Sequence, residues 1–434
     1  MTGKKSAIVL VIDGMADLPH PEKGGGKTPM EIANTPNMDR LAKEGHVGYI
    51  HSIGPWQIGG SDTSHVGLLG YDPFKGYTGR GPIEVAGTGV DLKPGDVSIR
   101  CNYCTVNGDM NVLNRTASYV REGVEQLAKA LNDGITLSDE RVSVEFRNSA
   151  DYRCVVYFRG PGISANISDM DPSYDIIVDS PSLKEHLKKN PKIVDCKPKD
   201  TTPEAQHMAD LLNEWVKKGN EILDNHPVNL ERKEKGLPPA NCIMPRGAGE
   251  TPTYQEFQDK WHLKGACVAG TGLIKGIGKL TGMYIPDVPG ATGYIDTDLM
   301  SKANVTLQCL KDGYEFILIH IEGTDEVSHD GLFDIKTKAI EDCDEMVGYL
   351  MKEIPRDTVL CILSDHSTPC VAGDHTADPS PIVFWSPDET LMVPDRLSSF
   401  VERNACKGSL KHLDGKDLIP LLLNYMDRSM KFGS

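Results

Sequence analysis

Short apolar runs alternate with amphipathic stretches along most of this chain. The run Ala7–Ile12 is continuously apolar and is followed at once by Asp13, which predicts a strand buried on both faces. Similar runs precede Asp325 and Asp365, and the segment Val97–Val106 also indicates a strand. Several strands of the fold can therefore be expected to lie deep in the molecule, each ending in a polar residue.

Helix signals lie between these runs. Thr35 suits an N-cap, Pro36 suits the first helical position and Gly45 suits a stop, so a helix is expected between them. After a turn-rich stretch, a further helix is expected to begin at Ser61.

Two longer helices are expected at residues 120–133 and 203–218. In both, apolar residues recur every three or four positions, and a glycine follows, Gly134 or Gly219. Alternation of strands and helices on this scale favours an α/β fold with largely parallel sheets.

The acids that follow the predicted strands lie only in the first and last parts of the chain, at Asp13, Asp325 and Asp365. A middle segment carries strands and helices of its own but none of these acids. We therefore expect one discontinuous catalytic domain, residues 1–85 and 255–434, with a second α/β domain inserted at 86–254.

Net charge and cysteine content indicate which partners and which cellular compartment the protein can have. The chain has 434 residues and a formal net charge of −16, which disfavours nucleic acids and anionic membranes as partners. Any anionic substrate must then be held by a local arginine cluster or by metal. No run approaches membrane length, and the 11 cysteines are irregularly spaced, with Cys101 and Cys104 expected on opposite faces of a strand. A cytoplasmic protein with reduced thiols is expected.

Three acids follow buried-strand signals, and histidines lie close to two of them. Ligands of open α/β sheets bind outside the carboxyl ends of the strands, so these side chains are expected to converge. One such aspartate alone would more often cap a helix, but carboxylates and imidazoles together suit divalent transition ions. The six residues suffice for two ions: Asp13, Asp325, His329, Asp365, His366 and His375.

The segment Gly59-Gly60-Ser61-Asp-Thr-Ser-His65 offers a nucleophile. A serine at a helix N-terminus lies in a positive field, and a nearby metal would activate its hydroxyl. By itself Ser61 would be read as an N-cap; beside two metals it is the expected nucleophile. Thr63 and Ser64 are the alternatives.

Two glycine-rich segments fail as nucleotide-binding motifs. Gly24-Gly-Gly-Lys-Thr28 lacks the first glycine and the preceding strand of a P-loop, and Gly276-Ile-Gly278 lacks a correctly placed third glycine. Arginines of the middle region are better candidates for binding phosphate or carboxylate, Arg246 beside a glycine-rich turn above all. The others are Arg80, Arg100, Arg115 and Arg153.

Taken together, the motifs resemble the cofactor-independent phosphoglycerate mutases of the archaeal type, within the alkaline phosphatase superfamily. The resemblance runs from the first strand to about Leu418. It is carried by Asp13–Asp17, Lys27–Pro29, Thr35–Ala42, Gly60–His65, Leu69–Pro73, Tyr77–Glu84, Asn241–Gly249, Gly323–Gly331 and Ser364–Pro369.

This resemblance implies an alkaline-phosphatase-like domain, a mainly parallel sheet flanked by helices, with an inserted substrate-binding domain. It implies two divalent ions, most often Mn²⁺, with Zn²⁺, Co²⁺ or Mg²⁺ as alternatives. One ion would be held by Asp13, Ser61, Asp365 and His366, and the other by Asp325, His329 and His375. Ser61 would be the nucleophile, Arg246 a substrate arginine and Lys275 a contact of the transferring phosphoryl group.

The implied reaction interconverts 3-phosphoglycerate and 2-phosphoglycerate through phosphoserine, with domain closure excluding water. The chain departs from the family pattern at Asn114–Tyr119, where relatives carry a more basic run, so the substrate arginines stay open. A related phosphotransferase or phosphatase, such as a homoserine kinase-like enzyme, is the alternative. The sequence says nothing of the oligomeric state.

Overall fold

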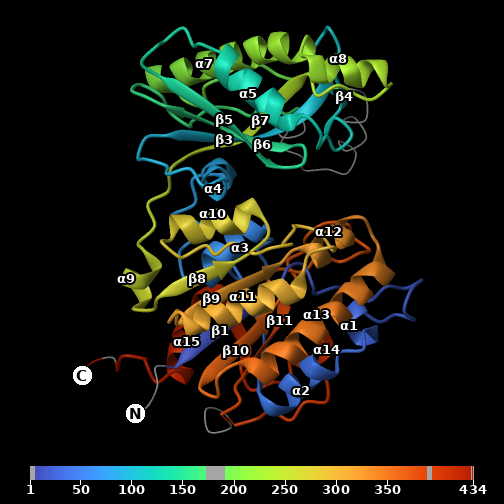
Figure 1. Ribbon diagram of the computed structural model, residues 1–434. Coiled ribbons are helices and arrows are strands. Elements are labelled where there is room, and N and C mark those ends of the chain that lie inside the picture. Colours follow the sequence, from blue (N-terminus) through green and yellow to red (C-terminus); the bar gives the residue numbers. More distant parts are fainter. Residues whose placement is uncertain (1–4, 173–190, 389–392, 432, 434) are drawn as a thin grey trace. The chain divides into compact units, whose positions relative to one another are not determined.

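The computed structural model of the protein describes residues 5–172, 191–388, 393–431 and 433. The chain divides into two compact units, one built from Met1–Tyr77 and Tyr254–Ser434 and the other from Thr78–Thr253 (Figure 1). Each unit has its own sheet and its own core. The first boundary lies at residue 77 rather than at 85, because helix α4 (Arg80–Gly87) packs against strands of the second unit.

The first unit contains a seven-stranded sheet in the order β12-β2-β11-β10-β1-β9-β8. All neighbours pair in parallel except β11, which is antiparallel to both β10 and β2. The strands are β1 (Ser6–Ile12), β2 (His46–His51), β8 (Gly265–Val268), β9 (Phe316–Ile321), β10 (Thr358–Leu363), β11 (Ser380–Trp385) and β12 (Lys411–Asp414).

The central strand β1 is apolar throughout because both of its faces are covered. Val9 pairs with Leu318 of β9 on one side and Cys361 of β10 on the other, and every residue of β1 is buried. Residues of α2, α11 and α13 belong to the same core cluster as Ile8, Leu10 and Ile12 on one face of β1, and Figure 1 shows α11 and α13 lying across the sheet. The sequence pattern of a doubly covered strand is thereby explained.

The helices of this unit begin and end as follows: α1 (Pro29–Ile32), α2 (Pro36–Glu44), α3 (Ser61–Leu68), α9 (Phe257–Trp261), α10 (Gly272–Leu280), α11 (Leu299–Lys311), α12 (Gly323–His329), α13 (Phe333–Glu353), α14 (Glu402–Ala405), the 3₁₀ helix η1 (Gly415–Asp417) and α15 (Leu418–Tyr425). The predicted helix between Thr35 and Gly45 is confirmed as α2, and α3 begins at Ser61 as expected.

The second unit has a five-stranded sheet in which every pairing is antiparallel, so the expectation of largely parallel sheets is wrong here. One reason is that a short turn joins neighbouring strands and so makes them antiparallel. Strands β5 and β6 form such a hairpin, with Asp151 in the turn at a φ of 52°. The strands are β3 (Val97–Val106), β4 (Val112–Asn114), β5 (Ser143–Ala150), β6 (Arg153–Arg159) and β7 (Cys242–Glu250).

Helices cover both faces of this second sheet. Core residues of α5 (Val124–Gly134) and α7 (Pro203–Asp224) pack on one face, and α4 packs on the other (Figure 1). A fourth helix, α8, spans Pro227–Glu234.

Both predicted long helices exist, with different ends. Helix α5 begins at Val124 rather than 120, because Gly123 before it takes a left-handed conformation with φ of 78°. Helix α7 continues through Gly219 to Asp224, so the predicted stop at that glycine is wrong. Gly219 instead permits close packing, since an added Cβ would lie 3.2 Å from Leu131 of α5.

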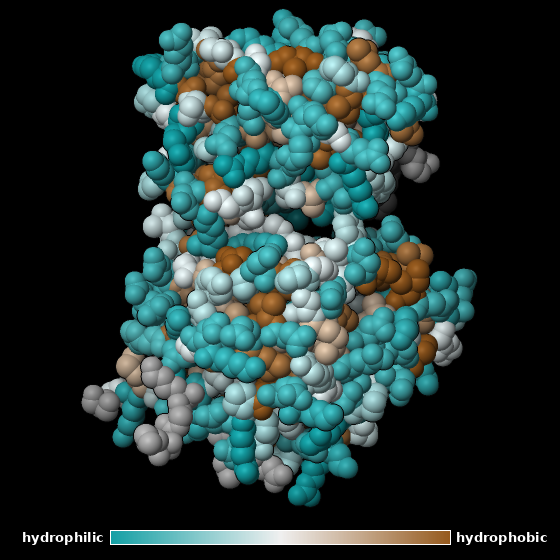
Figure 2. Space-filling view, viewed as in Figure 1, coloured by the Kyte–Doolittle hydropathy of each residue, from teal (hydrophilic) through white to brown (hydrophobic). Residues whose placement is uncertain are grey.

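Among the described residues, no helix has the length and apolar character needed to cross a bilayer. On the face drawn in Figure 2, hydrophilic side chains surround scattered apolar ones.

Candidate active site

Three neighbouring parallel strands of the first unit deliver the three predicted acids. Strands β10, β1 and β9 lie side by side, and their carboxyl ends share one edge of the sheet. Asp13 follows β1 directly, Asp365 follows β10 by two residues, and Asp325 lies in α12 after β9. All three are buried, with exposures of 0%, 2% and 6%.

One group forms around His366. Its Nε2 lies 3.1 Å from Asp13 Oδ1, 3.4 Å from Asp365 Oδ2 and 3.3 Å from the hydroxyl oxygen of Ser61. The loop after β10 and the start of α3 therefore meet the end of β1 at a single point.

A second group forms around Asp325. His329 Nε2 lies 3.3 Å from Asp325 Oδ2, and His375 Nε2 lies 3.6 Å from Asp325 Oδ1. The ring of His375 stacks on that of His366 with centroids 3.8 Å apart, which joins the two groups. All six predicted ligands thus lie in one cluster. Two triads have donor atoms within reach of a single ion, Asp13–Asp365–His366 and Asp325–His366–His375.

Hydrogen bonds fix the orientation of all three imidazoles. His329 Nδ1 donates to the carbonyl of Gly373 at 3.0 Å, and His375 Nδ1 donates to that of Gly59 at 2.8 Å. The Thr368 hydroxyl donates to Asp325 at 2.6 Å and so accepts from His366 Nδ1 at 3.0 Å. Each ring therefore presents Nε2 to the carboxylates.

A nitrogen that faces a carboxylate oxygen needs a proton or a metal cation between the two atoms. Histidine held by its other nitrogen, with Nε2 free of its proton, is the usual state of a metal ligand. Oxygen and nitrogen donors in this combination suit a divalent transition ion. The residues present therefore fit metal ions.

The electrostatics of the carboxylates supports the same reading. Burial, and then the charge of Asp325, raises the pKa of Asp13 to about 8. Burial, and then the charge of Asp13, raises the pKa of Asp365 to about 8. Acids crowded in this way repel one another and gain stability from any cation placed among them.

Where no metal is bound, protons on the histidines offset part of the negative charge of the carboxylates. The hydrogen bond with Asp325 raises the pKa of His329 to about 9. Burial acts to lower the pKa of His375, but the bond with Asp325 outweighs it and raises the pKa to about 9. Burial acts to raise the pKa of Asp325, and its bonds with His329 and His375 reverse this and hold the pKa well below its ordinary value.

Ser61 is the first residue of α3, and Gly60 is the N-cap, so the alternative reading of Ser61 as a cap does not hold. The Thr63 hydroxyl is bonded to the backbone of Gly60 at the helix start. Ser64 is fully buried, and its hydroxyl has no hydrogen-bond partner among the described residues. Only Ser61, of these three, has a hydroxyl in contact with the His366 group.

Two residues outside the predicted set support the strand ends. Gly14 has a φ of 58°, and an added Cβ would lie 2.4 Å from Asp325 Oδ1, so no side chain fits there. Lys336 of α13 is fully buried and donates to Asp17 Oδ2 at 2.8 Å, Ala16 O at 3.3 Å and Thr368 O at 3.0 Å. The ammonium thereby ties together the loops that follow β1 and β10.

Two further histidines at the site were not predicted. His65 lies one turn after Ser61 and donates from Nδ1 to its carbonyl at 2.7 Å. His320 of β9 contacts Asp13 Oδ2 at 2.9 Å, and Glu322 lies 3.8 Å beyond it. The available signal was a histidine inside an otherwise apolar strand, which sequence alone reads equally well as a core residue.

The five predicted arginines lie together in the second unit. Arg100 of β3 pairs across the sheet with Arg246 of β7, on the face covered by α4. Glu84 of α4 accepts from Arg80 at 2.7 Å and lies 3.1 Å from Arg100. Burial, and then the neighbouring charges, lowers the pKa of Arg100 to about 10 although Glu84 opposes this.

A second carboxylate completes the arginine cluster. Asp171 is fully buried, accepts from Arg115 in bidentate fashion at 2.5 and 2.8 Å, and lies 3.2 Å from Arg246. Arg153, at the start of β6, lies near enough to Glu84 to lower the pKa of that carboxyl. Glu84 and Asp171 thus contact this group of arginines, whose guanidinium groups are suited to an anion.

Lys275 lies half-buried on α10, a helix of the first unit that packs against α3. It therefore lies in the unit that holds the acid and histidine cluster, not with the arginines.

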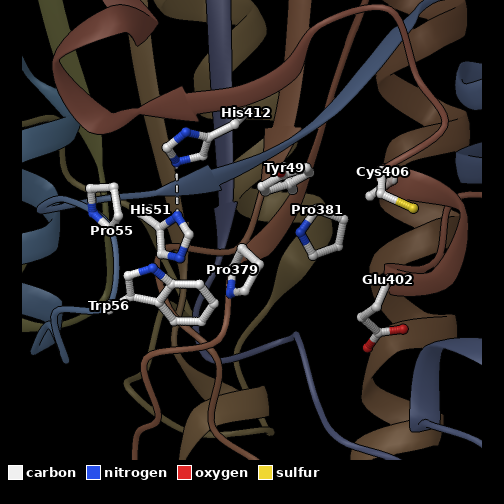
Figure 3. Close-up of a pocket in the computed structure, with 10 residues that line it drawn as sticks. Tyr49, His51, Pro55, Trp56, Pro379, Pro381, Glu402, Cys406 and His412 are labelled. Carbon is white, nitrogen blue, oxygen red and sulfur yellow. Dashed lines mark hydrogen bonds between the residues drawn. The ribbon is translucent and has the colours of Figure 1, made fainter.

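The first unit also has a pocket of about 420 Å³ that includes none of the predicted site residues (Figure 3). In it, His51 and His412 are hydrogen bonded at 2.8 Å and Tyr49 stacks on His412. Trp56, Pro55, Pro379, Pro381, Glu402, Ala405 and Cys406 complete the wall.

Two family models match the chain. One, described as 2,3-bisphosphoglycerate-independent phosphoglycerate mutase, matches residues 42–229. The other, described as type I phosphodiesterase / nucleotide pyrophosphatase, matches residues 192–383.

Curated relatives are similar over their full length. A 2,3-bisphosphoglycerate-independent phosphoglycerate mutase 1 of Methanothermobacter thermautotrophicus is 44% identical over 98% of this chain and 99% of its own. That of Methanocaldococcus jannaschii is 42% identical over 99% of this chain and 100% of its own.

Solved structures share the fold. A protein of Pyrococcus horikoshii matches with a TM-score of 0.80 at 32% identity, covering 99% of this chain and 100% of that one. The cofactor-independent phosphoglycerate mutase of Thermoplasma acidophilum matches with a TM-score of 0.67 at 30% identity, covering 97% of this chain and 100% of that one. The fold class expected from the sequence is confirmed.

Proposed function

Since the chain belongs to the family of 2,3-bisphosphoglycerate-independent phosphoglycerate mutases, we propose that it interconverts 3-phosphoglycerate and 2-phosphoglycerate through a phosphoserine at Ser61. The enzyme is an isomerase that moves a phosphoryl group within one small substrate. Its two divalent cations, Mn²⁺ by preference, are held by the acids and histidines of the first unit.

The ligands divide between two ions. Asp13, Asp365, His366 and the Ser61 hydroxyl hold one, which accords with their mutual contacts around His366 Nε2. Asp325, His329 and His375 hold the other. When bound, such cations lower the pKa of a coordinated hydroxyl and neutralise phosphoryl oxygens.

The residues of the chain then carry out two transfers. The Ser61 oxygen attacks phosphorus, a bond from that oxygen to phosphorus forms, and the bond from phosphorus to the C3 oxygen of glycerate breaks. The proton lost by Ser61 is balanced by one gained at the C3 oxygen. The glycerate C2 hydroxyl then attacks the phosphoserine, restores the Ser61 hydroxyl and yields 2-phosphoglycerate.

Substrate binding is assigned to the arginine cluster and to Lys275. The carboxylate of glycerate suits a bidentate guanidinium, and Arg246 is a candidate because it shares Asp171 with Arg115. Lys275 is the candidate for the transferring phosphoryl group, because its helix packs against the helix that begins at Ser61.

The observation that carries the proposal is the shared orientation of three histidines. Each points Nδ1 at an oxygen and presents Nε2 to buried carboxylates beside the Ser61 hydroxyl. This arrangement leaves the Nε2 atoms and the carboxylate oxygens facing a common centre, as ligands of a cation do.

The test compares the protein with its Ser61→Ala variant, both loaded with Mn²⁺, in an enolase-coupled assay of the mutase reaction. We expect turnover only with Ser61, unchanged thermal unfolding of the variant, and a trapped phosphoserine in the parent protein after an acid quench. Residual mutase activity in Ser61→Ala would show that another nucleophile acts.

The match to a phosphodiesterase model over residues 192–383 favours one alternative, a phosphatase or other phosphotransferase on the same site. Release of inorganic phosphate from small phosphomonoesters without any isomerisation would identify that activity and exclude the mutase.

A further inference from the structure

His320 is a buried histidine of β9 to which the proposed ligand set gives no role. It is 0% exposed, and its Nε2 lies 2.9 Å from Asp13 Oδ2. Its backbone pairs with Val11 of β1, two residues before that aspartate. Strand register alone therefore brings the imidazole beside the carboxylate.

The two oxygens of Asp13 face different partners. Oδ1 lies 3.1 Å from His366 Nε2, on the side of the proposed ion, and Oδ2 faces His320. A carboxylate bound through both oxygens could not maintain this division. The geometry fits a ligand that offers one oxygen to metal and keeps the other in a hydrogen bond.

The proton of this hydrogen bond can be assigned. With a cation bound, Asp13 is ionised and only accepts, so His320 would carry the proton on Nε2 and donate it to Asp13. Its Nδ1 has no hydrogen-bond partner among the described residues, which is consistent with an unprotonated nitrogen there.

From these contacts we propose that His320 is a positioning residue that orients Asp13 as a ligand to one cation through a single oxygen. The inference rests on the proposed function, in which Asp13 binds metal.

Two further contacts fix the position of His320, one to its backbone and one to its ring. Lys302 of α11, itself fully buried, donates from Nζ to the His320 carbonyl at 2.9 Å. The ring of His65 meets it edge-on, with centroids 4.9 Å apart. A donor fixed in this way can restrict the carboxylate without losing its own place.

A third cation held by Asp13, His320 and Glu322 is the competing reading, because their donor atoms lie within reach of one ion. Lys302 argues against it. Its ammonium lies at the backbone of His320, and its charge interacts with that of Glu322, so a positive charge is already present there.

The experiment titrates Mn²⁺ into the metal-free full chain and follows free Mn²⁺ by its EPR signal, a readout independent of activity. His320→Leu removes the donor, and His320→Gln keeps an amide N–H that can reach Asp13. We expect the parent protein to bind two ions, His320→Leu to bind one of them about 10–100-fold more weakly, and His320→Gln to recover most of that loss.

Ile319→Ala is the matched control. Ile319 precedes His320 on β9, is fully buried and packs in the core on the other face of the sheet. It should lower the unfolding temperature while leaving both Mn²⁺ affinities unchanged.

The outcomes separate the two levels of inference. A parent protein that binds no Mn²⁺ would overturn the proposed function together with the role of His320. Two tight ions in both the parent and His320→Leu would overturn only the role of His320, as would equal losses in the Leu and Gln variants. Three ions in the parent, one of them lost in His320→Leu, would instead establish His320 as a ligand.

Discussion

Without its cations, the folded protein should lose stability as the pH rises from about 7 to about 8. In the fold, burial and mutual repulsion raise the pKa of Asp13 and Asp365 to about 8. In the unfolded chain both carboxyls are ionised far below neutral pH. Between these values the metal-free fold holds protons that the unfolded chain does not, so the free energy of unfolding falls with pH.

The magnitude follows from the number of extra protons. Each one changes the free energy of unfolding by about 1.4 kcal/mol per pH unit. Asp13 and Asp365 repel one another, so one to two protons is the reasonable count, which gives a loss of about 1.4–2.7 kcal/mol over that unit. His329 and His375, each with a pKa raised to about 9, act in the same direction and add to this loss.

Histidines with lowered pKa act in the opposite direction but at lower pH. Burial lowers the pKa of His65, His320 and His366. As the pH falls, the unfolded chain therefore binds protons at these residues before the folded chain does. Over that range the free energy of unfolding rises with pH. That gain is largely complete above the unfolded value near 6.5. Between about 7 and about 8 these three histidines therefore contribute little, and the slope reports the two aspartates together with His329 and His375.

The assay is urea unfolding, followed by circular dichroism, of protein dialysed against EDTA and then freed of chelator. The same measurement with Mn²⁺ should give stability that holds or rises over this window, because metal binding requires deprotonated ligands. Metal-free Asp13→Asn, which has one carboxyl fewer to protonate, should show a shallower slope. Metal-free parent protein whose stability stays flat or increases would refute the electrostatic reading of the cluster.

Three other changes test separate parts of the structure. Chelation should abolish activity and added Mn²⁺ should restore it; full activity after exhaustive EDTA dialysis would contradict a metal mechanism. Lys336→Met leaves Asp17 buried without its ammonium and should cost about 3–5 kcal/mol in urea unfolding, with a loss under about 1 kcal/mol ruling out a structural role. Arg246→Ala should raise the KM for phosphoglycerate about tenfold or more with little change in unfolding, and an unchanged KM would remove this residue from the substrate site.

Much of the fold could be predicted because hydrophobic periodicity reports burial directly. Strand β3 has the predicted limits, and α2 lies between its predicted cap and stop. The same reasoning brought the acids together, because parallel strands that are neighbours in a sheet end at the same edge. It needed only that β10, β1 and β9 be adjacent, which they are.

The second unit shows where such reasoning fails. Strand direction depends on connections, and the turn at Asp151 lacks the Asn-Gly or Gly-rich signal that usually marks a hairpin. Gly219 shows the same limit in a helix: a glycine that ends helices elsewhere permits close packing here. Neither outcome is encoded in the local sequence alone.

The sequence also could not predict which charged residues pair with one another. The five arginines could be named as a group, but nothing marked Glu84 and Asp171 as the carboxylates that hold them. His320 is similar, since a lone histidine in an apolar strand acquires meaning only from the neighbour that strand register supplies. Such pairings depend on contacts between residues far apart in the chain.

Charge explains why the two clusters differ in kind. The substrate is an anion at both ends, and the protein itself carries a net charge of −16. In the second unit, we propose that guanidinium groups hold the carboxylate of the substrate, because arginine keeps its proton even when buried. In the first unit, ionised Asp13, Asp325 and Asp365 would repel a phosphoryl group, and the divalent cations that we propose there would offset their charge. The proposed metal would therefore favour the binding of phosphate as well as its transfer.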